Sequence, residues 1–253
     1  MWESSGEGQQ GSVVRVLELD PDLGVDLDAD ALESATSELV APLARVDWTR
    51  HRGRWEPAAE SSFGVLVVAG MLMREVQLLG TYSAEILGVG DVLRPWDADS
   101  EFALPVPAGV HWTVLTQVEV AVLTTAFLHR AAKHPEVLSR LMGRALGRAR
   151  TLALHDAVTN LKHVETRLLV HFWHMAERWG TMGPDGVSIE MPLTHEMLAK
   201  LVGATRPSVT TGLGRLAARG LLMRRPDGVW WLRHDSTHAL EPLPIQEETG
   251  LPR

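Results

Sequence analysis

LTHEMLAKLVGATRPSVTTGLGRLAARG, residues 193–220, predicts two short amphipathic helices separated by a glycine turn. Thr194 can cap the first helix, because a threonine hydroxyl accepts a hydrogen bond from an unpaired amide of the first turn. Gly203 is expected to end the first helix and Gly220 the second. Both helices carry apolar residues at helical spacing: Leu198, Leu201 and Val202 in the first, and Val209, Leu213 and Leu216 in the second. The pattern is typical of a helix-turn-helix.

The second helix has a clear start signal and is followed by a hairpin. Thr205 is its expected N-cap, and Pro207 lies in the first turn, where a missing N–H group costs nothing. The runs 221–224 and 229–232 are short and apolar, and Arg-Pro-Asp-Gly at 225–228 provides a turn between them. Helix, turn, helix and hairpin together predict a winged helix.

Basic residues are concentrated in this segment. Residues 192–235 contain seven Lys/Arg and three Asp/Glu, a net charge of +4, whereas the whole chain carries −8. Residues 1–134 contain twenty acids and nine bases, a net charge of −11. A basic segment in an acidic chain predicts double-stranded DNA as its partner. Two amphipathic helices also occur in αα-hairpins that bind no DNA, so the alternative is a protein-interaction module whose acidic N-terminal half recruits a partner.

The segment before residue 124 has the pattern of β-strands. Short apolar or alternating runs, separated by glycine and proline, occur at 13–19, 64–68, 71–78, 84–87 and 112–123. They predict a β-sandwich or barrel, preceded by a helix over about residues 29–46. Gly88-Val89-Gly90-Asp91 is expected to reverse the chain between two strands.

Composition argues against several classes of protein. The 253 residues include no cysteine, which excludes disulfides, thiolate zinc sites and cysteine-ligated iron–sulfur clusters. No segment approaches the roughly 20 apolar residues of a membrane span, and residues 1–12 lack the pattern of a signal peptide, so we expect a flexible leader and a cytoplasmic protein. An enzyme is not expected, because neither a nucleophile–base–oxyanion arrangement nor a phosphate-binding glycine loop is evident. Histidines 155, 163, 171 and 174 lack carboxylate partners at ligand spacing, and we expect packed or solvated side chains and no metal.

A long helix is predicted from Pro135 to about Leu161, a segment with no further proline. Residues at three- and four-residue spacing form a seam that is apolar at its N-terminal end and polar at the other. The seam consists of Leu138, Leu141 or Met142, Ala145, Ala149, Leu152, Asp156 and Thr159. We expect a homodimer that places two recognition helices about one DNA turn apart. The alternative is a helix packed only on its own domain.

Over residues 13–233 the chain resembles the Crp/Fnr family, the catabolite-activator and fumarate–nitrate regulators. The resemblance is carried by GVLVVAGMLMREV, AEILGVGDVL, QVEVAVLTTAFLHRAAKHPEVLSRLM and LTHEMLAKLVGATRPSVTTGLGRLAARGLL, of which the last is the specific part. It implies an α+β chain with a double-stranded β-helix (jelly-roll) sensor domain of cyclic-nucleotide-binding type, a long dimerisation helix and a C-terminal winged helix-turn-helix. The expected parts are a leader (1–12), the sensor (13–134), the dimerisation helix (135–163), the reader (164–235) and a flexible tail (236–253). The implied function is transcription regulation at palindromic promoter sites.

The sensor departs from the family at its ligand site. Family members that bind cyclic AMP carry a Gly-Glu pair for the ribose and an Arg followed by Ser or Thr for the cyclic phosphate. Counting back from Glu119 places these pairs on Asp97-Ala98 and Ala108-Gly109, and a Thr-Ser pair that touches the purine falls on Leu154-His155. None of them matches, and without the arginine an anion loses its charge-assisted hydrogen bonds. We expect no cyclic AMP. Two interpretations of the pocket stay open. It is either a filled structural remnant of a nucleotide site, or a site for another effector, such as another cyclic nucleotide, a metabolite or haem.

In the reader, the resemblance assigns base contacts to Arg206 and Thr211, and an arginine there can pair bidentately with guanine. A third base-reading position falls on Pro207, whose side chain cannot hydrogen-bond a base. The full set of expected DNA-contacting residues is Thr194, His195, Thr205, Arg206, Ser208, Thr210, Thr211, Arg215, Arg224 and Arg225. Residues 183–186, Gly-Pro-Asp-Gly, resemble the family's surface turn that contacts RNA polymerase and are equally an ordinary β-turn.

Overall fold

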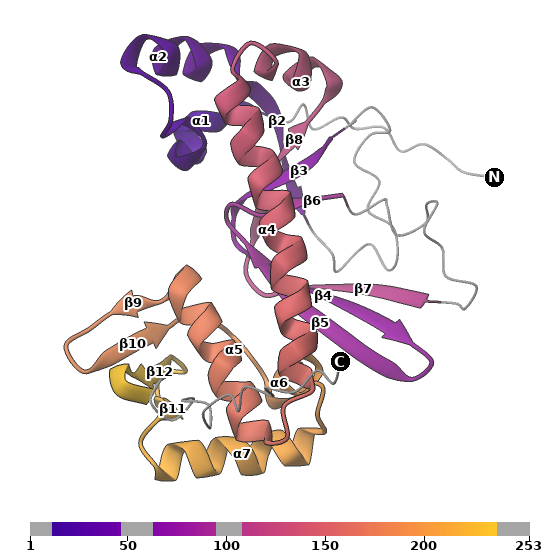
Figure 1. Ribbon diagram of the computed structural model, residues 1–253, viewed down its shortest axis with the longest axis vertical. Helices are drawn as coiled ribbons and strands as arrows, with labels where there is room; N and C mark the ends of the chain where they lie inside the picture. Colours follow the sequence, from indigo (N-terminus) through magenta and orange to yellow (C-terminus); the bar gives the residue numbers. More distant parts are fainter. Residues whose placement is uncertain (1–11, 47–62, 95–107, 237–253) are drawn as a thin grey trace, which may run out of the picture. The chain divides into compact units, whose positions relative to one another are not determined.

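The computed structural model describes residues 12–46, 63–94 and 108–236, and the chain divides into two compact units (Figure 1). Unit 1 extends to Leu154 and unit 2 begins at His155. The helix α4 (Pro135–Thr159) therefore contributes residues to both units. The domain boundaries expected from the sequence, at residues 134 and 163, stay a prediction. None of the helices in the described ranges combines the length and the apolarity that crossing a bilayer requires.

Unit 1 is built on two antiparallel sheets. One has the strand order β1 (Val13–Arg15), β2 (Val40–Val46), β8 (Val118–Leu123), β3 (Gly64–Ala69) and β6 (Val92–Leu93). The other has the order β5 (Thr81–Gly88), β4 (Met71–Leu78) and β7 (Ala108–Val114). The hairpin of β4 and β5 pairs without interruption from Met71 opposite Gly88 to Leu78 opposite Thr81. These sheets confirm the β-rich sensor expected from the sequence.

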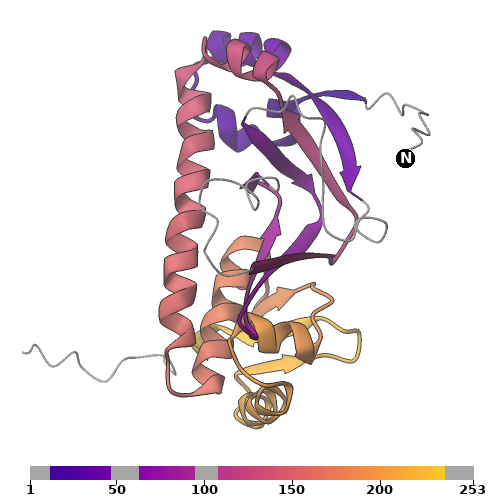
Figure 2. The same ribbon diagram turned by 90° about the vertical axis from the view of Figure 1, so that its right-hand side faces the viewer.

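Buried apolar residues explain why these segments pack. Leu66 and Ala121 of the five-stranded sheet join Phe127 of α3 (Thr125–Ala131) and Leu141 of α4 in one cluster, all without exposed surface. A second cluster joins strands of both sheets: Val65, Val67, Leu72, Leu87, Leu93, Val118 and Val120. In Figure 2, α4 is a single continuous helix that runs beside the strands of unit 1.

Two sequence predictions near the N-terminus are wrong. The helix predicted over 29–46 ends at Glu38, and β2 follows, because Pro42 lacks the N–H group that a helix interior needs. The strand predicted over 13–19 divides into β1 and a short helix, whose Val16 and Leu17 enter the core. The helices of unit 1 before α4 are α1 (Val16–Leu19), η1 (Pro21–Gly24), α2 (Ala29–Glu38) and α3 (Thr125–Ala131).

Unit 2 has the predicted winged-helix order. Its elements are α5 (Val164–Trp179), β9 (Thr181–Met182), β10 (Gly186–Ile189), α6 (His195–Leu201), α7 (Arg206–Ala218), β11 (Leu222–Arg224) and β12 (Trp230–Arg233). The strand order is β11-β12-β10-β9, so two further strands extend the predicted hairpin. Phe172 of α5 packs against Trp230 with ring centroids 4.8 Å apart, and both side chains are buried. This aromatic pair anchors the sheet to the helices.

Candidate nucleic-acid interface and effector pocket

Hydroxyl caps and a glycine set the geometry of the helix-turn-helix. Thr194 Oγ1 accepts a hydrogen bond from the Met197 N–H (3.2 Å), and Thr205 Oγ1 accepts one from the Ser208 N–H (3.4 Å). Between the two helices Gly203 has a φ of +59°, a backbone conformation that favours glycine. Both predicted caps and the predicted glycine turn are confirmed.

One arginine connects this turn to the loop before α5. Arg167 Nη1 donates to the carbonyl oxygens of Val202 (3.2 Å) and Gly203 (3.1 Å). Its Nε donates to the carbonyl oxygen of Leu161 (2.7 Å). These carbonyls follow the C-terminal ends of α6 and α4, where no further helical N–H group is available to them. Sequence analysis missed Arg167, because two of its three partners are distant along the chain.

The N-terminal ends of α6 and α7 carry most of the predicted DNA-contacting residues. His195 Nδ1 and Thr210 Oγ1 lie 2.9 Å apart, and Thr210 Oγ1 also donates to the Arg206 carbonyl oxygen (3.1 Å). The hydroxyls of Thr205 and Ser208 lie 2.9 Å apart. All five side chains are at least partly exposed. Helix N-termini carry positive partial charge and bind phosphate, so these ends suit a DNA backbone.

Arg215, another predicted DNA contact, has a protein partner. Its Nη1 lies 2.6 Å from Glu165 Oε1 of α5. The hydrogen bond and charge of Arg215 hold the pKa of Glu165 below its ordinary value. The positive charge of Arg215 is thus partly balanced within unit 2, which the sequence pattern did not reveal.

The wing places its two arginines over tryptophan rings. Arg224 Cζ lies 5.5 Å from the ring centroid of Trp230, and Arg225 Cζ lies 5.9 Å from that of Trp231. Arg224 Nε also donates to the carbonyl oxygen of Gly228 in the turn (3.2 Å). Trp230 is buried and Trp231 only partly, as alternation along a strand predicts. Both arginines are exposed, so they are available to phosphates.

A cavity of about 420 Å³ lies between the start of α5 and α7. Lys162 and His163 line it on one side, and Pro207, Ser208 and Thr211 on the other. Lys162 and His163 add basic side chains beside the recognition helix α7. Sequence analysis missed them, because they lie outside the helix-turn-helix pattern.

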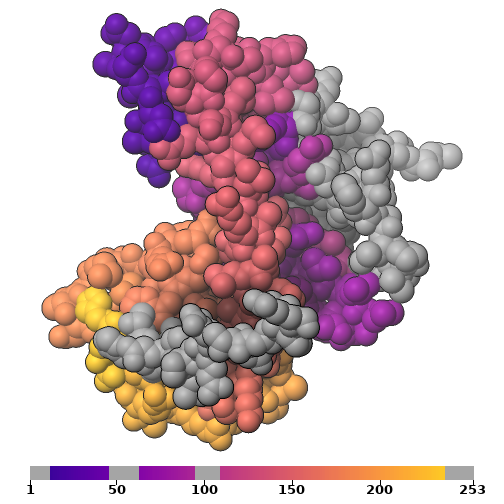
Figure 3. All heavy atoms as spheres, in the orientation of Figure 1, coloured from indigo at the N-terminus to yellow at the C-terminus, as the bar shows by residue number. Residues whose placement is uncertain are grey.

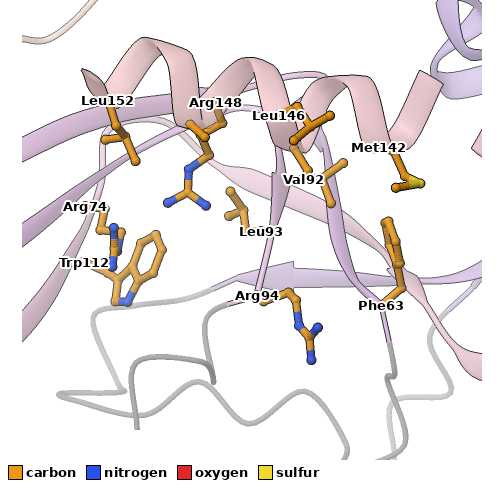
Figure 4. Close-up of a pocket in the computed structure, with 12 residues that line it drawn as sticks. Phe63, Arg74, Val92, Leu93, Arg94, Trp112, Met142, Leu146, Arg148 and Leu152 are labelled. Carbon is orange, nitrogen blue, oxygen red and sulfur yellow. The ribbon is translucent and has the colours of Figure 1, made fainter. Parts of the chain in front are cut away.

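Unit 1 contains a larger cavity, of about 580 Å³, between α4 and the strands (Figure 4). Arg74, Trp112 and Arg148 lie together at one end, and Phe63 and Met142 lie at the other. The described lining therefore has two arginines at one end and is otherwise apolar except for Arg94, which lies between Leu93 and Phe63 in Figure 4.

A buried carboxylate organises the cationic end. Glu85 Oε1 accepts hydrogen bonds from Arg74 Nη1 (3.0 Å) and Arg148 Nη2 (2.6 Å), and Glu85 Oε2 accepts one from Arg148 Nε (3.1 Å). Burial raises the pKa of Glu85, but the hydrogen bonds and charges of Arg148 and Arg74 outweigh it and hold the pKa below its ordinary value. One carboxylate balances two guanidinium groups, so the three side chains together keep a net positive charge.

The residue pairs aligned with a cyclic-nucleotide site are Asp97-Ala98, which lie outside the described residues, Ala108-Gly109 on β7, and Leu154-His155 on α4. Gly109, Leu154 and His155 are not among the described residues that line the cavity. Sequence analysis missed Arg74 and Arg148, because only the fold brings them to one carboxylate.

All but one of the residues predicted to form the seam of α4 are at least partly exposed, and their role in dimerisation stays a prediction. Met142, Leu146 and Leu152 are 58%, 59% and 37% exposed, and α4 side chains lie at the surface in Figure 3. Leu138 is half-buried, and Ala145, Ala149 and Asp156 are exposed. Leu141 is wrong as a seam residue, because its side chain is fully buried in the core of unit 1. Sequence analysis did not include Leu146 in the seam. Leu146 lies one turn after Met142, which the predicted seam gave as the alternative to Leu141.

Three histidines lie close together in unit 2. The His155 ring centroid is 4.6 Å from that of His171 and 5.6 Å from that of His174. Burial lowers the pKa of His171 to about 3, and the charges of His155 and His174 act in the same direction. Among the described residues, no three His, Cys, Asp or Glu side chains are placed to hold a metal ion.

The helix-turn-helix, its basic wing and its exposed recognition helix define a winged-helix nucleic-acid-binding domain. Residues 166–236 match the family of Crp-like helix-turn-helix domains. Unit 2 thus contains a Crp-like DNA-binding domain, which confirms the sequence resemblance for the reader.

Curated and solved proteins are similar to larger parts of the chain. The global nitrogen regulator of Synechocystis sp. is 31% identical over 108 residues, which are 42% of this chain and 48% of that protein. The chain spans about half the length of the curated relatives it matches.

Two solved structures share the fold across both units. A cyclic nucleotide-binding domain containing protein from Listeria monocytogenes has a TM-score of 0.62 at 15% identity, over 87% of this chain and 99% of that one. The c-di-GMP responsive global regulator CLP of Xanthomonas campestris has a TM-score of 0.54 at 18% identity, over 81% and 99%. At these identities the likeness establishes the fold alone.

Proposed function

We propose that this chain is a homodimeric transcription regulator of Crp/Fnr type that binds palindromic promoter sites. The observation that carries the proposal is the exposed N-terminal end of α7 together with a basic wing, in a segment that matches Crp-like helix-turn-helix domains. Arg206 supplies a base contact, and Thr205 and Ser208 supply phosphate contacts together with Arg224 and Arg225 of the wing. No catalytic step is assigned to the protein.

A footprint of the ligand-free protein tests this proposal. The DNA is the promoter region upstream of the protein's own gene, with a random duplex pool as a second target and excess nonspecific DNA present. We expect a palindromic protected site whose affinity falls steeply with salt, because phosphate contacts release counterions. A folded dimer that enriches no sequence from the pool, yet retains a protein partner at high salt, would contradict DNA binding and favour the protein-interaction module.

The dimer is proposed to form through α4. Met142, Leu146 and Leu152 lie at intervals of four and six residues and share an exposed face with the small residues Ala145 and Ala149. The same five residues border the cavity of unit 1, so the proposed interface adjoins the proposed effector site. Small side chains allow two helices to approach closely, and the leucines and the methionine provide apolar area to bury. This pairing supports recognition of two half-sites by one molecule.

The cavity of unit 1 is proposed as the site of an effector that is a small organic anion with an apolar body. Its volume lies in the range of small-molecule sites. Arg74 and Arg148 favour an acidic group at one end, and Phe63 and Met142 favour an apolar group at the other. Cyclic AMP is disfavoured, because the residue pairs that hold its ribose and phosphate are missing.

Calorimetry on the full chain tests the effector proposal. We expect no heat from micromolar cyclic AMP, and a rise in thermal stability with at least one member of a panel of aromatic and aliphatic carboxylates. Arg74→Gln should abolish that rise, whereas Arg45→Gln, on an exposed arginine outside the cavity lining, should leave it unchanged. Micromolar binding of cyclic AMP would contradict the proposal.

The turn between β9 and β10 is proposed to contact RNA polymerase. The Gly183 N–H donates to the Gly186 carbonyl oxygen (2.8 Å), which fixes a tight turn with Asp185 exposed at its tip. Asp185→Lys should change transcription from a target promoter in vitro without changing DNA affinity. Unchanged transcription would identify these residues as an ordinary turn.

A further inference from the structure

The recognition helix presents an unusual surface where it starts. Its exposed residues over the first three turns are Arg206, Pro207, Ser208, Thr210, Thr211, Gly214 and Arg215. Arg206 and Arg215 are the long polar side chains among them, and Arg215 is paired with Glu165. A side chain added at Gly214 would meet nothing within 4 Å. Between the two arginines, the exposed side chains are therefore short and partly apolar.

Pro207 and Thr211 are the centre of this apolar part. They are four residues apart on α7, so they share one face of the helix. They line the same cavity as Lys162, His163 and the paired side chains of Arg215 and Glu165. Lys162 and Arg215 outnumber the one carboxylate, which suits a phosphate backbone passing beside this face. The hydroxyl of Thr210, on the neighbouring face, is already bonded to His195 and to the Arg206 carbonyl.

The chemistry of Pro207 restricts what it can recognise. Its side chain contains only carbon, its backbone has no N–H group, and it is exposed at the second position of α7. The C5-methyl group of thymine is the apolar group that the major groove offers at a base edge. The other groups by which the major groove distinguishes the bases are hydrogen-bond donors and acceptors, which a proline side chain cannot satisfy.

We propose that Pro207, supported by Thr211 one turn later, recognises a thymine methyl group in each half-site. Sequence preference at that base pair then comes from an apolar contact, whereas the neighbouring preference set by Arg206 comes from hydrogen bonds. The assignment rests on the proposed DNA-binding function.

Replacing thymine by uracil tests the contact directly, because uracil keeps the base pair and lacks only the methyl group. A half-site is first selected from a random pool with the full-length protein. Each thymine of that site is then replaced in turn, in both half-sites. We expect one position at which uracil lowers affinity by roughly fourfold per half-site, the value of one buried methyl-sized group.

Two variants make the test specific. Pro207→Glu should remove the uracil effect and shift selection toward cytosine at that position, because a carboxylate accepts a hydrogen bond from cytosine N4. A glutamate in the first turn also suits the helix dipole, so α7 should stay folded. Ser208→Ala is the matched control: it should weaken binding to all sites and keep the uracil effect.

The possible outcomes distinguish failure of the assignment to Pro207 from failure of the proposed DNA-binding function. A selected site with no methyl-sensitive thymine, or a uracil effect that persists in Pro207→Glu, would overturn the assignment to Pro207 and leave DNA binding in place. Selection of no site at all by the wild-type protein would overturn the proposed function, and this assignment with it.

Discussion

Under the proposed function, two exposed arginines of the DNA reader serve specificity and affinity separately. Arg206 begins α7, the proposed recognition helix, whereas Arg225 lies in the wing turn, 5.9 Å from the Trp231 ring. Contacts to bases carry sequence information, and contacts to phosphates do not. The same side chain, an exposed arginine, therefore has different consequences at the two positions.

Replacing each arginine by alanine should separate these effects. Arg206→Ala should relax sequence preference at one base pair by about 1–3 kcal/mol. Arg225→Ala should weaken binding to all sequences about equally and reduce the salt slope by about 2 in the dimer, one unit for each protomer. Titrations with the selected site and with random DNA at several salt concentrations measure both properties. Equal loss of both properties in each variant would contradict the division.

His171 shows how burial sets the pH dependence of a single side chain. Its folded pKa is about 3, because desolvation disfavours the charged imidazole. In the unfolded chain a histidine titrates near pH 6.5. Between these values the unfolded state binds the proton and the folded state does not. The group therefore costs stability as the pH falls below 6.5, and costs nothing above it.

We expect the stability of the protein to fall below pH 6.5 with a contribution from His171 of up to about 1.4 kcal/mol per pH unit. His171→Leu should remove this contribution, and His129→Leu, on an exposed histidine of α3, should keep it. Urea unfolding of the full chain between pH 7 and pH 5 measures how the free energy of unfolding changes with pH. Amide hydrogen exchange in α5 monitors the unfolding around His171. A decline that is the same in His171→Leu and wild type would rule out this role.

At the scale of elements, α4 carries two adjacent apolar stripes. Val137 and Leu141 are fully buried in the core of unit 1, whereas Met142 and Leu146 are exposed. The sequence shows both stripes as one broad apolar pattern, so it cannot tell which residues of a helix face its own domain. Only the packing of the strands against α4 decides between Leu141 and Met142.

The dimer interface should depend on the second stripe alone. Leu146→Glu should raise the dimer dissociation constant at least tenfold, since it removes two leucines from the interface and buries two charges. Leu154→Glu makes the same change at another exposed leucine of α4, outside the seam, and should leave association unchanged. Sedimentation equilibrium of both variants measures the difference. If both changes weaken the dimer equally, the seam lies elsewhere.

At the scale of the whole molecule, charge is divided unevenly along the chain. Residues 192–235 carry +4, whereas residues 1–134 carry −11. Under the proposed function, DNA is therefore bound by a small basic surface in a chain whose N-terminal half carries negative charge. In the proposed dimer, specific affinity then comes from a few contacts made twice.

The salt dependence of site-specific binding should reflect that small surface. If Arg224 and Arg225 of both protomers each neutralise one phosphate, the slope of log affinity against log salt is about −4. Titrations between 50 and 200 mM salt measure it. A slope near zero would mean that these arginines do not contact the backbone.

Local signals were predictable across the molecule, and long-range pairs were not. The caps Thr194 and Thr205 and the turn at Gly203 follow from neighbouring residues, and all were confirmed. The pairs Arg215–Glu165 and Arg148–Glu85 join residues 50 and 63 positions apart, and no local pattern indicates them. The same limit applies to the two cavities, since their lining residues are distant along the chain.

The three carbonyl contacts of Arg167 have a mechanical consequence. They join the loop after α4 to the turn before α7, and so restrain movement of the two segments relative to each other. We therefore expect a displacement of the last turn of α4 to shift the start of α7 with it, and expect Arg167→Ala to weaken this coupling.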